Sequence, residues 1–413
     1  MDCTVSGQLL LPDGPRRVRL SPGTLEIRGE RIASVSPDLH PRPDFGGPTC
    51  LITPGFVDTH VHLPQFDSIG LDGLELLTWL DRVIFPAEAK WADADYAGQM
   101  STRVAKELLS FGTTAVAAFA TSHHHATRNA IAALAKAGLR GHVGQVLMDR
   151  NAPPQLLVPA RQALASAASL KPLGRIAPAV TPRFAITCSD DLLRGSGELA
   201  RKSGWLVQTH LAETRRELEV IAELFPGQRY TDVYKQAGLL TDRTLLAHGI
   251  WLDAQDHAAI AAAGSTIAHC PTANRFLDAG EMNRANALAE QVQVSLGTDV
   301  AGGPDRSMVR VARAKIDTAK QLRRVNPATP VPTAAECWWQ ITQGNAQALH
   351  LRDGGALAPG AWADLVVINP ASTPAGAHWQ ESPDPLATTL YAWDDRWLCA
   401  TFAAGTLAYR PQN

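Results

Sequence analysis

Residues 55–65 read GFVDTHVHLPQ, an apolar run that ends in two histidines two positions apart. In an extended strand successive side chains alternate between the two faces, so His60 and His62 would project to the same side. Two imidazole rings at that spacing suit a metal ion. For an isolated His-x-His pair, however, strand capping and packing are the commoner roles, so the rest of the chain has to decide.

The composition is typical of a globular protein. The chain has 413 residues, of which 45% are hydrophobic and 19% are charged, and its formal net charge is -2. This balance excludes the basic footprint of a nucleic-acid-binding protein. No run reaches the ~18 apolar residues of a membrane span, and the acidic start differs from a signal peptide. We therefore expect a cytoplasmic protein whose partner is a small molecule, with no nucleic acid and no membrane.

The spacing of the apolar runs predicts the fold. Between Gly55 and about His350, short apolar runs alternate with Ala- and Leu-rich helical stretches. Eight such runs begin at residues 55, 113, 140, 175, 205, 244, 265 and 292. Eight strands separated by helices indicate an α/β fold, a (β/α)8 barrel of the TIM type, with its chemistry at the carboxyl ends of the strands.

Both ends of the chain are rich in predicted strands. LEIRGERIASV, at residues 25–35, indicates two strands about Gly29, and ADLVVINP and WLCATFAAGTLAYR indicate further strands near the carboxyl terminus. We expect a small discontinuous β-sandwich domain formed by both termini, from residues 1–53 and 354–413. It would flank a hydrolase barrel of residues 54–353.

Four of the eight predicted strands end in residue types that bind metals. These residues are His60 and His62 after the first run, His210 after the fifth, His248 after the sixth and Asp299 after the eighth. Any one of them alone could be a buried, hydrogen-bonded structural residue. Nitrogen and carboxylate ligands without thiolates match a catalytic zinc or iron site that keeps a position open for water. Five such residues at one barrel mouth therefore predict a metal centre.

HLAE, at residues 210–213, adds a carboxylate just beyond one of these histidines. A bound Zn2+ lowers the pKa of its water to about 7, and a glutamate within hydrogen-bond reach can carry that proton to a substrate. Glu213 would also complement the dipole of a helix that starts there, and the two roles are compatible. We expect Glu213 to carry protons.

The motifs PGFVDTHVH, QTHLAE, LAHG and LGTD, in this order, resemble the amidohydrolase superfamily. Within it, PQ after the second histidine and TPRF at 181–184 are similar to the guanine deaminases, as are FPAE at 85–88 and FATSH at 119–123. The resemblance extends from Leu51 to GNAQALHL at 344–351. HHHAT at 123–127 departs from the usual loop, and we interpret His123, His124 and His125 as loop or rim residues rather than as a second metal site.

The resemblance implies roles for individual residues. It implies one zinc ion per chain, or alternatively Fe2+, with the ligands His60, His62, His210 and Asp299. It places His248 near the reacting water and implies three catalytic residues, Glu213, His248 and Asp299. Three further residues match family positions that contact the purine, namely Gln65, Arg183 and Phe184.

The reaction implied by the resemblance is hydrolytic deamination of guanine at C2 to xanthine and ammonia. A related barrel with the same metal ligands could instead act on 8-oxoguanine, a pterin or a triazine, or hydrolyse a ring C–Cl bond. A non-catalytic assembly protein of this superfamily would be expected to lack ligands or the glutamate, and here all are present. The relatives also suggest a homodimer.

Overall fold

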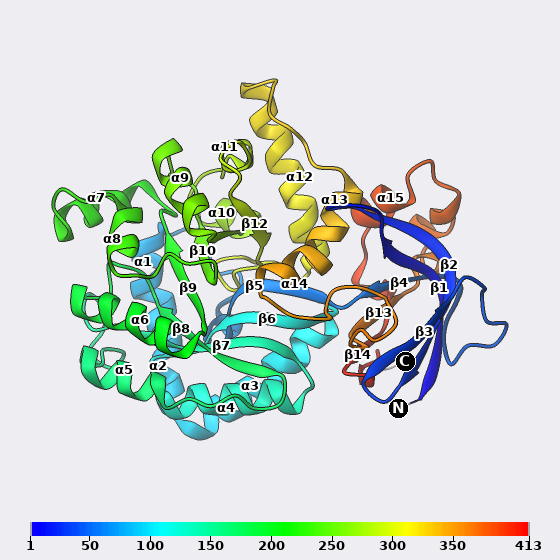
Figure 1. Ribbon diagram of the computed structural model, residues 1–413, viewed down its shortest axis with the longest axis horizontal. Coiled ribbons are helices and arrows are strands. Elements are labelled where there is room, and N and C mark those ends of the chain that lie inside the picture. Colours follow the sequence, from blue (N-terminus) through cyan, green and yellow to red (C-terminus); the bar gives the residue numbers. More distant parts are fainter. Residues whose placement is uncertain (1, 412–413) are drawn as a thin grey trace.

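The computed structural model describes residues 2–411 and contains two β-sheets. One is an eight-stranded barrel, and the other is a smaller sheet that contains strands from both ends of the chain (Figure 1). Helices α12 and α13 lie between them. Within the described residues, no helix combines the length and apolar character needed to cross a bilayer.

The barrel confirms the predicted fold, because its strands coincide with the eight apolar runs. Its neighbouring strands pair in parallel, in chain order. The strands are β5 (Phe56–His62), β6 (Thr113–Phe119), β7 (Arg140–Leu147), β8 (Ile176–Pro182), β9 (Leu206–Leu211), β10 (Thr244–His248), β11 (Thr266–His269) and β12 (Gln293–Leu296). Parallel strands present their carboxyl ends at one rim, so the polar residues that follow them can meet.

Most helices connect or surround the barrel strands, and the last one lies beside the smaller sheet. The helices are α1 (Leu76–Trp79), α2 (Phe85–Ala89), α3 (Ala94–Ser110), α4 (His124–Lys136), α5 (Ala160–Ala168), α6 (Asp190–Ser203), α7 (Arg215–Leu224), α8 (Tyr230–Gln236), α9 (Ala254–Ala263), α10 (Pro271–Phe276), α11 (Arg284–Ala289), α12 (Met308–Val325), α13 (Ala334–Trp339), α14 (Asn345–Ala348) and α15 (Pro385–Tyr391). Short non-α helical segments include η1 (Leu63–Ser68), η2 (Leu80–Ile84) and η4 (Gln340–Gly344). The segment from η1 to α2 follows the first strand and leads over the barrel mouth.

Contacts between β5 and the segment after β12 close the barrel. Asp58 accepts hydrogen bonds from the Thr298 amide at 3.0 Å and from its hydroxyl at 2.5 Å. A Cβ at residue 297 would lie 2.6 Å from the Cβ of His60, so this close approach requires Gly297. The amide of Asp299 then donates to the carbonyl of His60 at 2.9 Å. The LGTD motif thus carries Asp299 to the histidines of β5.

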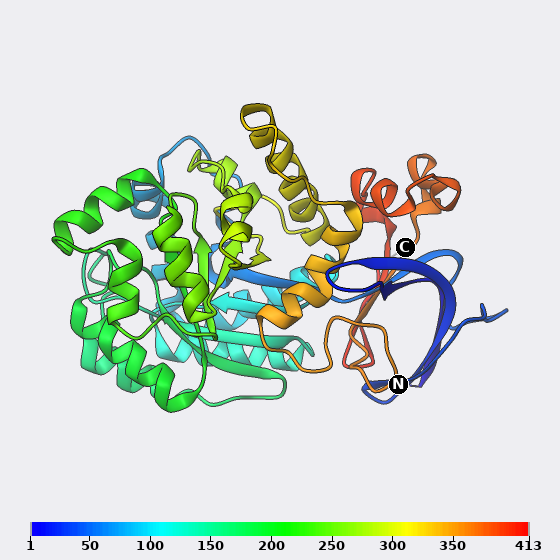
Figure 2. The same ribbon diagram turned by 45° about the horizontal axis from the view of Figure 1, so that its top comes forward.

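Both termini build the second sheet, as predicted. Its strands are β1 (Cys3–Pro12), β2 (Val18–Arg28), β3 (Arg31–Ser36), β4 (Phe45–Pro54), β13 (Leu365–Ile368), β14 (Leu398–Ala403) and β15 (Thr406–Tyr409). The strands are hydrogen bonded in the single order β15-β14-β13-β4-β1-β2-β3, with β13 antiparallel to β4. The sandwich expected from the sequence is therefore one continuous sheet, whose first strands curve strongly (Figure 2). Buried residues from both of its ends, such as Ile32 and Phe402, share one apolar core.

Candidate active site

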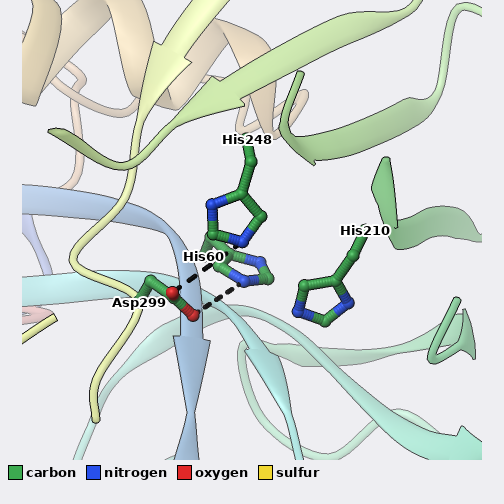
Figure 3. Close-up of side chains that lie close together, drawn as sticks. All are labelled: His60, His210, His248 and Asp299. Atoms are coloured by element: carbon green, nitrogen blue, oxygen red, sulfur yellow. Dashed lines mark ion pairs between the residues drawn. The ribbon is translucent and has the colours of Figure 1, made fainter. Parts of the chain in front are cut away.

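Four buried side chains converge at the carboxyl ends of the barrel strands. They are His60 on β5, His210 on β9, His248 at the end of β10 and Asp299 after β12, and their ligand atoms lie within 4.8 Å of one another (Figure 3). His62 adjoins this group, because its Nε2 is 3.2 Å from His210 Nε2 and 3.3 Å from Asp299 Oδ1. The structure thus brings together all five residues predicted at the strand ends.

Hydrogen bonds on the outer side of two imidazoles orient their inner nitrogens. His210 Nδ1 lies 2.7 Å from the carbonyl oxygen of Arg183, and because a carbonyl only accepts, Nδ1 donates. The lone pair of His210 Nε2 therefore faces the cluster. His248 Nδ1 lies 3.0 Å from Asn274 Oδ1, which likewise leaves His248 Nε2 as the inward-facing acceptor. Outer hydrogen bonds of this kind are typical of metal-binding histidines.

Two of the converging residues have a left-handed backbone. His248 has a φ of 71° and Asp299 a φ of 52°, which cost residues with a Cβ about 1 kcal/mol or more each. These conformations turn the chain at the end of each strand, where the side chains meet at the barrel mouth. The bond from the Asp299 amide to the His60 carbonyl helps to hold the second of them. The strained backbone at these two residues is therefore part of what brings their side chains to the cluster.

The protonation states of the cluster fit a metal ion. Burial lowers the pKa of His62 to about 3 and that of His210 well below its usual value, so both rings are neutral at pH 7. Burial alone would raise the pKa of Asp299, but its contacts with His60 and His62 hold that pKa well below the usual range. Neutral imidazoles and an ionised carboxylate are the forms that bind metals.

Unpartnered atoms point to the same conclusion. His248 Nε2 and Glu213 Oε1 are buried without a hydrogen-bond partner in the described part of the chain. Buried polar atoms without partners are costly, and a metal ion with its water would satisfy them. The donor set therefore fits a catalytic metal.

Glu213 lies beside this cluster, with Oε2 3.4 Å from His248 Nε2. The pKa of Glu213 is raised well above its usual value, mainly by burial and to a smaller extent by the nearby charge of Asp299. A carboxyl group with a raised pKa holds a proton more readily than an ordinary carboxylate does, which suits a proton carrier. Its position suits transfer between a water at the cluster and a substrate in the adjoining pocket.

A small cavity of about 30 Å³ adjoins Glu213 and the cluster. Gln65, Arg183 and Phe184, the three residues predicted to contact a substrate, all line it. Its other walls include apolar side chains from α1, η2 and the loop after α10, namely Leu76, Trp79, Leu80 and Leu277. These apolar side chains would exclude water from the part of a ligand that they contact, which strengthens polar contacts there.

A buried carboxylate that the sequence did not assign holds two of these residues. Arg183 Nη1 donates to Glu88 Oε1 at 2.6 Å and to Oε2 at 2.8 Å. Gln65 Nε2 donates to Glu88 Oε1 at 3.2 Å, and Gln65 Oε1 accepts from the Ala301 amide at 3.1 Å. Glu88 is fully buried, so it fixes both side chains within an environment that has little competing water.

Comparison with known proteins decides the family. The model of the amidohydrolase family matches residues 51–408, which is most of the chain. The chain belongs to the amidohydrolase family. Guanine deaminases are among its similar relatives: that of Rattus norvegicus is 35% identical over 332 residues, 78% of this chain and 73% of the relative. The guanine deaminase of Escherichia coli K12 is 34% identical over 371 residues, 87% of this chain and 83% of the relative.

Solved structures agree with the sequence comparison. The E. coli guanine deaminase superimposes with a TM-score of 0.91 and 30% identity, over 99% of this chain and 100% of the other. The guanine deaminase from C. acetobutylicum, with guanine bound in its active site, gives a TM-score of 0.91 and 28% identity over the same shares of the two chains. These similarities confirm the resemblance to guanine deaminases within the amidohydrolase family.

Several residues of this amidohydrolase site escaped the sequence analysis. Glu88 lies in FPAE and Asn274 lies in AHCPTAN. No rule of sequence spacing predicts that Glu88 contacts Arg183 or that Asn274 contacts His248. Of the three consecutive histidines, His123 lies in the loop after β6, as expected, whereas the other two lie in a helix. His123 precedes α4, and His124 and His125 begin that helix, where His124 Nδ1 contacts Gln145 Oε1 at 3.1 Å.

Proposed function

We propose that this amidohydrolase converts guanine to xanthine and ammonia by hydrolytic deamination. One observation carries the proposal: the same pocket joins a hydrogen-bonded polar pair, Gln65 and Arg183, to the proton carrier Glu213 and the metal-type cluster. The similarity to guanine deaminases of bacteria and animals supports the same substrate.

We infer that one zinc ion is held by His60, His62, His210 and Asp299. Three imidazoles and one carboxylate without a thiolate suit catalytic zinc, and Fe2+ is the alternative that this donor set also accepts. When bound, the ion supplies a Lewis acid that lowers the pKa of a coordinated water to about 7. His248 is then left to contact the reacting water, which can donate a hydrogen bond to its Nε2.

Recognition of the purine rests on the groups held by Glu88. The two hydrogen bonds to Glu88 both use Arg183 Nη1, so Nη2 and Nε can donate to the acceptor atoms of guanine. Gln65 offers a second amide hydrogen from Nε2. Phe184 supplies an apolar surface for the planar ring. Fixed donors of this kind place C2 of the purine near Glu213.

Glu213 carries the protons of the reaction. It accepts a proton from the attacking water as the water oxygen bonds to C2, and it delivers that proton to a ring nitrogen. C2 is then tetrahedral, with the new oxygen and the amino group both attached. His248 and Asp299 orient the new hydroxyl group as hydrogen-bond acceptors. Glu213 then takes the remaining proton of the new hydroxyl group and gives it to the amino group. The C2–N bond breaks as C2=O forms, so guanine and water become xanthine and ammonia.

A substrate screen tests the proposal. The purified, metal-loaded protein is incubated with guanine, adenine, cytosine, guanosine, 8-oxoguanine, a pterin and an aminotriazine, and ammonia and products are measured. We expect guanine to give xanthine and equimolar ammonia, and Arg183→Ala to weaken turnover without loss of metal. Guanine left unchanged while another heterocycle reacts would overturn the substrate assignment but not the metal and proton roles.

A further inference from the structure

A second cavity lies at the opposite end of the barrel from the active site. Its volume is about 120 Å³, and its lining includes Thr266 and Gln293, the first residues of β11 and β12. The metal-type residues instead lie at or beyond the last residues of their strands. Residues of α11, α12, α13, η4 and α14 also line it, and α12 and α13 lie between the barrel and the terminal sheet (Figure 1).

Lys315 of α12 lines this cavity as a buried cation that has no counter-ion within residues 2–411. Its side chain is only 2% exposed. In the described residues its one hydrogen bond goes to Gln340 Oε1, at the long distance of 3.5 Å, and no carboxylate lies within the 4.0 Å of an ion pair. Lysines are rarely buried without a partner, because removing an ammonium group from water is strongly unfavourable. Two of its three donors therefore face space that no protein acceptor fills.

Two arginines add positive charge to the same cavity. Arg284 begins α11, and its Nε is buried without a hydrogen-bond partner among the residues described. Arg16 reaches the cavity from the turn between β1 and β2, in the terminal sheet. The one carboxylate in the lining, that of Glu336, accepts bonds from the Thr333 amide at 2.7 Å and hydroxyl at 3.0 Å. The cavity therefore carries an excess of positive charge.

We propose that this cavity binds a small oxyanion, a phosphate or carboxylate group, with Lys315 and Arg284 as its main donors. Oxyanions offer several acceptor lone pairs, and charge-assisted bonds from ammonium and guanidinium groups are among the strongest in proteins. A volume of about 120 Å³ holds about four water molecules, which is room for one such group. Water alone would fill this space without balancing the charge.

The protonation state of Lys315 agrees with this role. Burial, followed by smaller effects of neighbouring charges, lowers its pKa to about 8, so most of the population is still charged at pH 7. An anion in the cavity would favour the charged form further. Because Arg16 belongs to the terminal sheet and Lys315 to the barrel, the anion would also connect these two parts of the molecule. Binding to the folded state alone stabilises the fold by mass action.

Calorimetric titration of the purified, metal-loaded protein tests the site. Inorganic phosphate and acetate are titrated separately at constant ionic strength set with chloride, and the expected result is saturable binding at one site per chain. Phosphate alone, acetate alone or both binding would each support the site and identify the group it prefers. No saturable binding of either anion would overturn the proposal.

Matched variants locate the bound anion. Lys315→Met should weaken binding about tenfold or more, the effect of one charge-assisted hydrogen bond. Lys320→Met is the control, since Lys320 lies on the same helix but is exposed and contacts Tyr391 instead. Without phosphate, Lys315→Met should melt at a higher temperature than the parent protein, because a buried, unpaired charge is removed. Phosphate should raise the melting temperature of the parent protein but not that of Lys315→Met. If Lys315→Met does not fold, Arg284→Gln gives the same binding test.

Phosphate could also bind the active-site metal, and one further variant distinguishes this from binding in the cavity. His210→Ala removes a proposed metal ligand and should leave oxyanion binding intact. Binding that is lost in His210→Ala but retained in Lys315→Met would place the anion at the active site and overturn the proposal. These measurements need no substrate, so they are independent of whether the protein deaminates guanine.

Discussion

Glu88 holds Arg183 through both carboxylate oxygens, with Nη1–Oε1 and Nη1–Oε2 distances of 2.6 and 2.8 Å, and both side chains are buried. The same carboxylate accepts a bond from Gln65. Neutralising Glu88 would leave a buried guanidinium without its counter-ion, and such groups move or draw in water. Glu88 is therefore a positioning residue, because it acts on the substrate through Arg183 and Gln65.

Glu88→Gln should lower kcat/KM for guanine by about tenfold to a hundredfold. This range corresponds to one hydrogen bond to a charged group, about 1.5 to 3 kcal/mol. Metal content should be unchanged, because Glu88 lies outside the ligand cluster. Steady-state kinetics and elemental analysis provide the measurement. Glu198→Gln, in an exposed pair with Lys202, is the matched control, and equal kinetics in both variants would contradict the role of Glu88.

Glu213→Gln should reduce turnover by a factor of at least about 100, the lower range for general acid–base catalysis. The amide keeps the size of the side chain, so fold and metal content should survive. Single-turnover kinetics with guanine and metal analysis of the same sample test this. A variant that turns over normally would show that another group, such as Asp299, carries the proton.

His210→Ala should lower both metal content and activity, since one of four proposed ligands is lost. Elemental analysis of the parent protein should give one equivalent of metal per chain. His123→Ala is the control and should retain the metal, because His123 lies outside the cluster. Two equivalents in the parent, or full occupancy in His210→Ala, would exclude the mononuclear site.

His142 predicts a dependence of stability on pH. It is buried, its Nε2 lies 3.0 Å from the carbonyl of Leu349, and burial lowers its pKa to about 4 from 6.5. A histidine with a lowered pKa stabilises the fold above pH 6.5, and this contribution is lost as the pH falls from 6.5 toward 4, because only the unfolded chain takes up the proton. The full effect is of the order of 3 kcal/mol.

His142→Gln keeps a hydrogen-bond donor but removes this titration. Urea unfolding at pH 7 and pH 5 should therefore show a smaller loss of stability in the variant than in the parent, by about 2 kcal/mol. His40→Gln, at an exposed position, controls for the removal of a titrating histidine. Parallel losses in the parent and in His142→Gln would mean that His142 titrates normally in the folded protein.

The sequence determined the barrel and the residues at its mouth. Alternation of apolar runs and helices is a local property, so each strand could be located from its own residues. In a parallel barrel the carboxyl ends of all strands meet at one rim, and this geometry alone predicts that His60, His62, His210, His248 and Asp299 lie together. Strands at both termini were equally visible, because their patterns are local.

Tertiary structure decided the contacts that depend on how distant segments pack. Glu88 and Arg183 are 95 residues apart, and they meet only because α2 is carried over the barrel mouth by the packing of residues such as Trp79. The sequence likewise could not predict that Lys315 has no ion-pair partner within the described residues, because this depends on where the carboxylates lie in the folded chain. The terminal strands form one curved sheet because hydrogen-bond pairing and curvature are properties of the assembled strands, whereas the side-chain pattern records only which residues are buried.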